Sequence, residues 1–371
     1  MSKEPIPLVD LRAQYHAIKP EMDAAINEVL EETAFIGGRR VAEFAQEFAE
    51  LIGVEHCVPV ANGTDAIFIT LKMLGIGSGD EVVTVANSWI STSETISQTG
   101  ARPVFVDIDE YFHIDVTKLE AAINERTKAI IPVHLYGQPA DMATVCEVAE
   151  RHDLKVIEDS AQAHLAQFDG RMVATFAEAG TFSFYPGKNL GAYGDAGAIV
   201  TNDAALAEKC KMYANHGALV KHQHVMEGIN SRLDGLQAAV LRTKLPHLRG
   251  WTEARQSIAG KFDQRLQSIE QIRIPKRRPN ATHSYHLYVI RAKERDGLAD
   301  HLRANGIGCA IHYPTPLPLL PAYEKFNYSH DAFAEAVAAS KEILSLPIYP
   351  ELPASAVERI GGCIEDFYSR T

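Results

Sequence analysis

Two neighbouring segments, Leu154-Lys-Val-Ile-Glu-Asp-Ser-Ala-Gln162 and Thr181-Phe-Ser-Phe-Tyr-Pro-Gly-Lys188-Asn-Leu-Gly191, decide the fold class. In each, a short apolar run of strand length ends in polar residues. The pattern recurs on both sides, from about residue 55 to about residue 205. The runs are rich in Val, Ile and Phe, as strands are, and they are Glu81–Ala86, Pro103–Asp107, Ala129–His134, Leu154–Glu158, Thr181–Phe184 and Gly197–Thr201.

Helix-like segments lie between several of these runs, at Thr64–Leu74, Val116–Ile123 and Met142–His152. Strands that alternate with helices predict an α/β fold with a mostly parallel sheet covered on both faces. In such sheets, ligands bind beyond the carboxyl ends of the strands. The residues that follow each strand are therefore the candidates for chemistry.

The pattern changes after a helix predicted at 231–247, which Pro246 closes. An α+β arrangement follows, with a helix near 252–269, a strand at Ser284–Ile290, a helix near 294–305 and a run at Cys309–His312. We therefore predict a large domain at 1–245, in which residues 1–55 form helices that wrap it, and a small α+β domain at 246–371. No low-complexity linker separates them, so they are expected to pack closely.

Composition excludes several classes of protein. The chain has 371 residues and a formal net charge of −12, and its densest basic run, Lys276-Arg277-Arg278, is too short for nucleic acid. No apolar stretch approaches about 18 residues, so no membrane span is expected. The five cysteines are scattered without a CxxC pair, which indicates reduced thiols and a cytoplasmic protein. His222 and His224 have no partner cluster, so no metal site is predicted.

The Pro-Gly turn before Lys188 places an amine at the end of a strand among apolar residues. Removal from water lowers the pKa of an amine, and a neutral amine is what Schiff-base chemistry needs. Taken alone, a solvated surface lysine is the commoner case. The segment is not a nucleotide-binding Gly-Lys-Ser/Thr loop, because Asn189 follows the lysine.

Three further positions suit a pyridoxal phosphate (PLP) site, each with an ordinary alternative. Asp159 ends a strand, where it could keep a pyridine nitrogen protonated or simply cap a helix. The Gly63-Thr64 pair opens a helix whose free N–H groups suit a phosphate, although a plain capped helix is commoner. Trp89 could stack on a pyridine ring or fill the core.

Taken together and in this order, the motifs resemble the DegT–DnrJ–StrS family of sugar aminotransferases, within PLP fold type I, the aspartate-aminotransferase-like fold. The resemblance covers nearly the whole chain. Its motifs are Phe35-Ile-Gly-Gly, Asn62-Gly-Thr-Asp-Ala, Pro103-Val-Phe-Val-Asp107, Ile131-Pro-Val-His-Leu-Tyr-Gly137, Glu158-Asp-Ser-Ala-Gln162, Ser183-Phe-Tyr-Pro-Gly-Lys188, Gly228-Ile-Asn-Ser-Arg232 and His312-Tyr-Pro.

The resemblance implies a role for each site residue. Lys188 would hold PLP as a Schiff base and later move the proton, and Asp159 would pair with the ring nitrogen. Gln162 would lie near the phenolic oxygen of the ring, and Trp89 would stack on it. The remaining implied residues are the phosphate ligands Gly63, Thr64 and Ser183, with Asn230 from the neighbouring subunit of a homodimer, and the substrate-side Tyr185, His312 and Tyr313.

The implied reaction moves an amino group from glutamate to a nucleotide-linked keto-sugar. A dehydratase branch of the family has His at the lysine position, so Lys188 favours transamination. The fragment Gly228-Ile-Asn-Ser-Arg-Leu-Asp234 resembles the C3-aminating branch more than the C4 branch. A keto-cyclitol or another keto-sugar as acceptor stays open, and so does a regulatory subunit without turnover. Intact Lys188, Asp159 and Trp89 argue against the latter.

Overall fold

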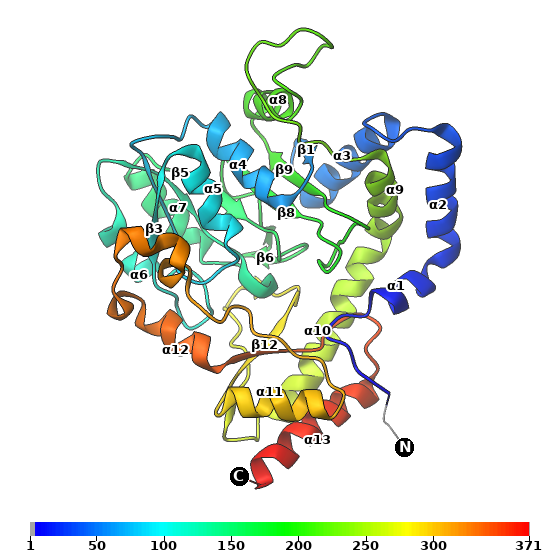
Figure 1. The fold of residues 1–371 in the computed structure, drawn as a ribbon, viewed down its shortest axis with the longest axis vertical. Helices are drawn as coiled ribbons and strands as arrows, with labels where there is room; N and C mark the ends of the chain where they lie inside the picture. Colours follow the sequence, from blue (N-terminus) through cyan, green and yellow to red (C-terminus); the bar gives the residue numbers. More distant parts are fainter. Residues whose placement is uncertain (1–3, 371) are drawn as a thin grey trace.

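A seven-stranded sheet forms the centre of the computed structural model, which describes residues 4–370 (Figure 1). The strands lie in the order β1-β9-β8-β5-β4-β2-β3. Only β9 runs antiparallel to its neighbours, so the predicted mostly parallel sheet is confirmed. The strands are β1 (His56–Val60), β2 (Glu81–Val85), β3 (Arg102–Val106), β4 (Thr127–Ile131), β5 (Lys155–Asp159), β8 (Ala179–Ser183) and β9 (Gly197–Thr201).

Helices cover this sheet and bury its inner strands. Every residue of β2 and of β9 is buried. The predicted helices appear as α4 (Gly63–Met73), α7 (Met142–Arg151) and the short α6 (Val116–Leu119) with η1 (Glu120–Ala122). Among the helices around this sheet, two had not been predicted, α5 (Ser91–Thr99) and α8 (Ala204–Tyr213). A small sheet of β11 (Ala281–Thr282), β6 (Gln167–Phe168) and β7 (Arg171–Met172) lies beside them.

The N-terminal segment is helical, as predicted, with α1 (Leu11–Ala17), α2 (Lys19–Glu32) and α3 (Arg39–Ile52). Both α2 and α3 pack on α9 (Gly235–Lys244), and Phe44 and Phe48 of α3 pack on Phe184. The residues before α1 go elsewhere, because Ile6 forms a parallel bridge with Ile307. The chain start therefore joins the C-terminal part of the molecule as well as the large sheet.

The C-terminal part has its own core and a three-stranded antiparallel sheet of β10 (Ile272–Arg273), β12 (Tyr288–Ala292) and β13 (Ile343–Leu346). Its helices are α10 (Leu248–Leu266), α11 (Arg295–Ala304), α12 (Ala334–Glu342) and α13 (Ala354–Arg370), with short 3₁₀ turns at Leu317–Leu319, Pro321–Phe326 and His330–Phe333. Figure 1 shows this part below the large sheet. Within residues 4–370, no helix is long and apolar enough to cross a membrane.

Three boundaries differ from the prediction. The helix expected at 231–247 begins at Gly235. Pro246 ends it as an α-helix, but it lies in a 3₁₀ turn that continues directly into α10 without an intervening loop. The strand expected at Ser284–Ile290 begins at Tyr288, because residues 284 and 287 bond to the backbone of Gly137 and Tyr136. The division near residue 246 stays a prediction.

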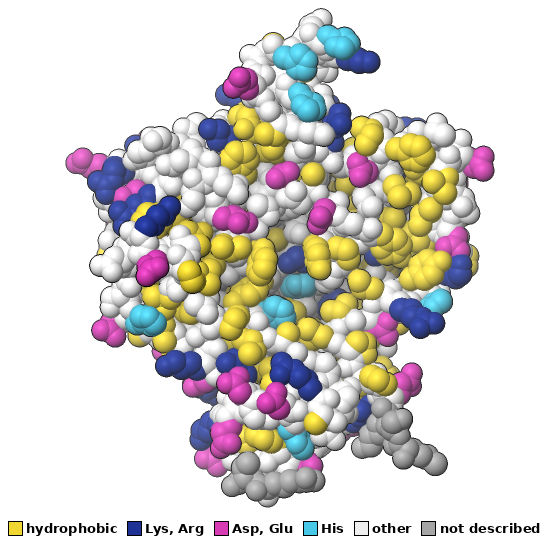
Figure 2. Space-filling model, in the orientation of Figure 1, with side chains coloured by type: hydrophobic (Ala, Val, Ile, Leu, Met, Phe, Trp, Pro, Cys, Tyr) yellow, Lys and Arg dark blue, Asp and Glu magenta, His cyan; other side chains and the backbone are white. Residues whose placement is uncertain are grey.

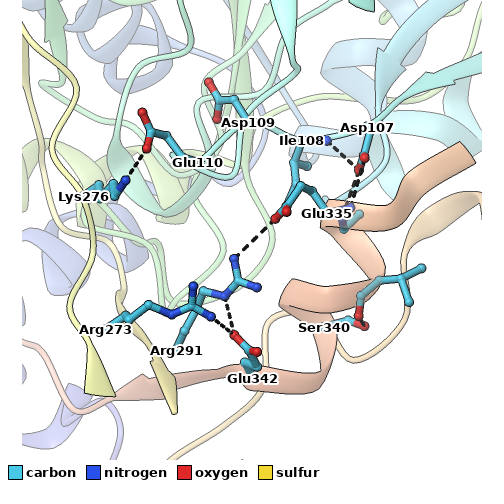
Figure 3. Close-up of polar contacts among 12 residues, drawn as sticks. Asp107, Ile108, Asp109, Glu110, Arg273, Lys276, Arg291, Glu335, Ser340 and Glu342 are labelled. Atoms are coloured by element: carbon cyan, nitrogen blue, oxygen red, sulfur yellow. Dashed lines mark hydrogen bonds and ion pairs between the residues drawn. The ribbon is translucent and has the colours of Figure 1, made fainter. Parts of the chain in front are cut away.

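Polar contacts join the loop after β3 to the C-terminal part (Figure 3). Asp107 accepts hydrogen bonds from the N–H groups of Glu335 (3.1 Å) and Ala336 (2.9 Å), which caps the start of α12. An ion pair joins Glu110 to Lys276, and Arg291 pairs with Glu342 at 2.7 Å. These contacts surround a cavity of about 510 Å³ that lies at this junction.

Candidate functional site

Lys188 and Asp159 come together because β5 and β8 are parallel neighbours, with Asp159 opposite Thr181. Lys188 lies in the turn after β8, which is closed by a 2.8 Å bond from the Lys188 N–H to the Tyr185 carbonyl. The lysine is half-buried. Burial lowers its pKa from 10.5 to about 8, and the charge of Asp159 partly opposes this by raising it. The amine is therefore suited to nucleophilic attack near neutral pH.

Asp159 is buried at the end of β5. Its Oδ2 accepts from the Thr92 hydroxyl at 2.8 Å, and its Oδ1 accepts from the Ala161 N–H at 3.2 Å. Burial raises the pKa of this carboxyl, and the bond from Thr92 is the largest of the effects that lower it. Turns and no helix come directly after Asp159, at residues 160–165, so the alternative of a helix cap is wrong. A carboxylate buried here is stabilised by a cationic partner.

The start of α4 offers free N–H groups near β8. Asn62 caps the helix by accepting from the Asp65 N–H at 2.8 Å, which leaves the N–H groups of Gly63 and Thr64 without that cap. Gly63 lies against β8, since a Cβ built on it would be 2.7 Å from the Ser183 Cβ. The predicted phosphate ligands Gly63, Thr64 and Ser183 therefore meet at one helix N-terminus, which favours an anion.

The aromatic side chains of Trp89 and Tyr313 form one wall of the site, the aromatic wall. The Trp89 side chain is 58% exposed, which is wrong for a core tryptophan and leaves its ring available for stacking. Its ring centroid is 5.7 Å from that of Tyr313. The Tyr313 hydroxyl accepts from Gln162 Nε2 at 3.2 Å, and Gln162 Oε1 accepts from the Tyr136 N–H at 2.7 Å. Gln162 is thus held in one orientation.

His312 joins this wall from the C-terminal part. Its Nδ1 lies 2.8 Å from Ser345 Oγ, and its carbonyl accepts from the Tyr136 hydroxyl. Burial lowers the pKa of His312 to about 4, so the imidazole is neutral at pH 7. The predicted substrate-side Tyr185 is 60% exposed. Figure 2 shows a hollow near the middle of the face in view, with hydrophobic side chains around it and basic and histidine side chains inside.

Asn230 is the predicted residue that does not join the others within this chain. It is exposed and forms an antiparallel bridge with Asn215 at the base of the loop 215–230. That loop stands out from the body of the molecule next to α8 (Figure 1). Within residues 4–370, Asn230 forms no hydrogen bond with Lys188 or Asp159. This placement is consistent with a residue that would serve a neighbouring subunit.

Residues that the sequence analysis missed support the predicted ones. Tyr136 orients Gln162 and the His312 carbonyl, and Thr92 holds Asp159. His134 accepts from the Ala140 N–H at its Nδ1 and bonds Glu158 through Nε2 at 3.0 Å, next to Asp159 in the chain. The serines and threonines that follow Trp89 were the available signal for Thr92.

These groups match the chemical groups of PLP one by one. An amine with a lowered pKa suits an aldehyde, a buried carboxylate suits a pyridine nitrogen, a helix N-terminus suits a phosphate, and an exposed indole suits an aromatic ring. The absence of a Cβ at Gly63 lets the start of α4 lie against Ser183, because a Cβ there would be 2.7 Å from the Ser183 Cβ. The residues therefore fit the cofactor. No group of three metal-ligating side chains occurs in the described part of the chain.

Comparison with known proteins agrees with this chemistry. A family model for the DegT/DnrJ/EryC1/StrS aminotransferases matches residues 16–365. The chain is 44% identical to a pleiotropic regulatory protein of Geobacillus stearothermophilus, over 98% of each chain. It is 40% identical to the dTDP-3-amino-3,4,6-trideoxy-α-D-glucose transaminase of Streptomyces venezuelae, over 98% of this chain and 97% of that one.

A solved structure extends the likeness to three dimensions. The crystal structure of S. venezuelae DesV in complex with a ketimine intermediate matches with a TM-score of 0.97 and 40% identity over 100% of both chains. The chain belongs to the DegT/DnrJ/EryC1/StrS aminotransferase family and is a PLP-dependent sugar aminotransferase.

Proposed function

We propose that the enzyme transfers an amino group from glutamate to C3 of a keto-sugar carried on a nucleotide. The observation that carries the proposal is the pair of Lys188, with a pKa of about 8, and the buried Asp159. The relative from S. venezuelae, whose name specifies a 3-amino sugar on dTDP, supports the acceptor class and the position. The segment at 228–234, which resembles the C3-aminating branch more than the C4 branch, also favours C3.

Each site residue has a defined task in this proposal, and Lys188 has two. Bound PLP supplies an aldehyde that bonds an amine and a ring that accepts electrons. Lys188 provides the amine and, once it is free, its Nζ takes the proton from the donor carbon. Asp159 holds the positive charge on the ring nitrogen. The N–H groups of Gly63 and Thr64, with Ser183, hold the phosphate.

The aromatic wall would exclude water and position the substrates. Trp89 would cover one face of the ring, and Gln162 would contact its phenolic oxygen. Tyr185, His312 and Tyr313 would face the substrates. Because His312 is neutral at pH 7, it can donate or accept one hydrogen bond to a sugar hydroxyl but adds no charge.

We also propose that the active unit is a homodimer in which Asn230 completes the partner's phosphate site. The exposed loop 215–230 and its exposed Val220 and Val225 support this, since such side chains are commonly covered in an assembly. Cys57, Cys146, Cys210 and Cys309 are free thiols, which supports the proposal that the enzyme works in the cytoplasm.

Two experiments test the function. Purified protein is expected to be yellow, and borohydride is expected to fix the cofactor to Lys188, as a mass spectrum of the peptide would show. Glutamate should then be assayed with a panel of nucleotide-linked 3-keto and 4-keto sugars, with keto-cyclitols as the competing acceptor class. A colourless protein that takes up no PLP would contradict the proposal.

A regulatory role without turnover is the second candidate, because the relative from G. stearothermophilus is named a regulatory protein. The two candidates differ in a single-turnover experiment. An enzyme converts bound cofactor to its amino form when glutamate is added, whereas a purely regulatory protein leaves the cofactor spectrum unchanged. Conversion at a rate useful for turnover would exclude the regulatory candidate as the sole role.

A further inference from the structure

A chain of two hydroxyl groups leads to Asp159. The Thr92 hydroxyl donates to Asp159 Oδ2 at 2.8 Å, and the Ser88 hydroxyl lies 2.9 Å from the Thr92 hydroxyl. Thr92 is in the first turn of α5, and Ser88 is in the loop just before it. The three side chains are at most 5% exposed, so water does not compete for these bonds.

The direction of the protons in this chain is fixed. A carboxylate oxygen only accepts, so the single hydroxyl proton of Thr92 is committed to Asp159. The Thr92 oxygen must then accept from Ser88, which donates its own proton. The chain therefore runs from Ser88 to Thr92 to Asp159, and it favours the ionised form of the acid.

The two oxygens of Asp159 are left in different states. Oδ2 receives the short bond from Thr92, whereas Oδ1 receives only the 3.2 Å bond from the Ala161 N–H. Lys188, His134 and Tyr313 are titratable groups that interact electrostatically with Asp159. Within the described residues, none of the three donates a hydrogen bond to its carboxylate. The hydroxyl chain is thus the one side-chain contact that both orients and stabilises the carboxylate.

We propose that Thr92 and Ser88 are positioning residues, whose aligned hydroxyls keep Asp159 ionised and reserve its Oδ1 for the ring nitrogen of the cofactor. The use of Oδ1 rests on the proposed function. The effect on Asp159 itself does not, because it concerns the cofactor-free protein.

A matched control lies on the same helix. Thr95 is buried like Thr92, but its hydroxyl donates only to backbone carbonyls, to Ser91 at 2.8 Å and to Thr92 at 3.3 Å. Thr95→Val and Thr92→Val make the same change of hydroxyl to methyl, one turn apart. Thr92→Ser keeps the hydroxyl and removes only the methyl group.

The first measurement is the ¹³C titration of Asp159 in the full-length, cofactor-free protein labelled at aspartate carboxyls, with the signal assigned by Asp159→Asn. Thr92→Val should raise the midpoint by about one to two pH units, the worth of one hydrogen bond to a charged group. Thr92→Ser should restore it and Thr95→Val should leave it in place. An unchanged midpoint in Thr92→Val, or an equal rise in Thr95→Val, would overturn the proposal.

Ser88→Ala covers the case in which Thr92→Val does not fold. It leaves the Thr92 bond but removes the donor behind it, so the midpoint should rise in the same direction by less. A midpoint that stays at the wild-type value in a folded Ser88→Ala protein would also count against the proposal.

The second measurement uses the holoenzyme with ¹⁵N-labelled cofactor, whose ring-nitrogen shift reports its protonation. Thr92→Val should deprotonate part of the population at pH 7.5, whereas Thr95→Val should not. If the Asp159 midpoint moves as expected but the ring signal does not, the hydroxyl chain stands and the assignment of Asp159 to the ring nitrogen fails. The two ideas therefore fail separately.

Discussion

The lowered pKa of Lys188 predicts how fast the cofactor-free protein captures PLP. At pH 7.5, an amine with a pKa of about 8 is about one quarter neutral, whereas one at the ordinary value of 10.5 is about 0.1% neutral. Only the neutral form attacks an aldehyde. The capture rate should therefore rise with pH to a plateau, with its midpoint near pH 8.

Stopped-flow absorbance measures this directly from pH 6.5 to pH 10. Dividing each rate by that of a simple lysine derivative at the same pH, after the latter is corrected for the neutral fraction of its own amine, removes the titration of the cofactor itself. Lys188→Ala is the control and should show no covalent capture. A midpoint near 10.5 would mean that Lys188 is solvated, and the argument from burial would then be wrong.

Asp159→Asn sharpens the test because it acts on binding and turnover in opposite directions. Burial is the larger effect on the Lys188 pKa, and the charge of Asp159 raises it. Without that charge the pKa should fall below about 8, so capture at pH 7.5 should become faster, by about fourfold at most because the neutral fraction starts near one quarter. Turnover should be lost, since an amide cannot hold the proton on the ring nitrogen. Slower capture, or near-normal turnover, would refute the reasoning.

Two further predictions concern the phosphate end of the site. Gly63→Ala should weaken PLP binding and lower the free energy of unfolding by about 1–3 kcal/mol, as overpacking does, because its Cβ would be 2.7 Å from the Ser183 Cβ. Gly77→Ala is the control, since its Cβ would be an ordinary 3.6 Å from the nearest atom, and equal losses in a fluorescence titration would remove the steric argument. Mixing inactive Lys188→Ala and Asn230→Ala proteins should restore part of the activity, because a mixed dimer has one intact site. No recovery despite subunit exchange shown by mass spectrometry would place Asn230 in its own subunit's site.

The sequence predicts most of the central sheet, because six of its seven strands coincide with distinct apolar runs. It does not predict α5, whose sequence Ser-Thr-Ser-Glu-Thr-Ile-Ser-Gln-Thr has one apolar residue, Ile96. The helix buries hydroxyl side chains instead, and several of them bond to backbone carbonyls one turn earlier. Hydrophobic periodicity cannot find such a helix. The functional support for Asp159 was missed for the same reason.

The environment of Lys188 depends on residues far away in the chain, which a local motif cannot reveal. Asn189 Nδ2 donates to the Ser284 carbonyl at 3.0 Å, and its Oδ1 lies 3.3 Å from His286 Nδ1. Ser284 in turn donates its N–H to the Gly137 carbonyl at 2.8 Å, close to Tyr136. The segment 283–287 thus lies between the lysine turn and the aromatic wall, where a strand had been predicted to begin.

Burial opposes the charged forms of both central residues. It lowers the pKa of Lys188 and raises the pKa of Asp159, and the attraction between them offsets only part of each effect. In the cofactor-free protein, the half-buried Lys188 and the buried Asp159 therefore compensate each other's charge only in part. A bound ring nitrogen would give Asp159 a cationic partner of its own, and a covalent bond would remove the need for charge on the lysine. The same burial that opposes both charges thus makes the site selective for a ligand with an aldehyde and a basic ring nitrogen.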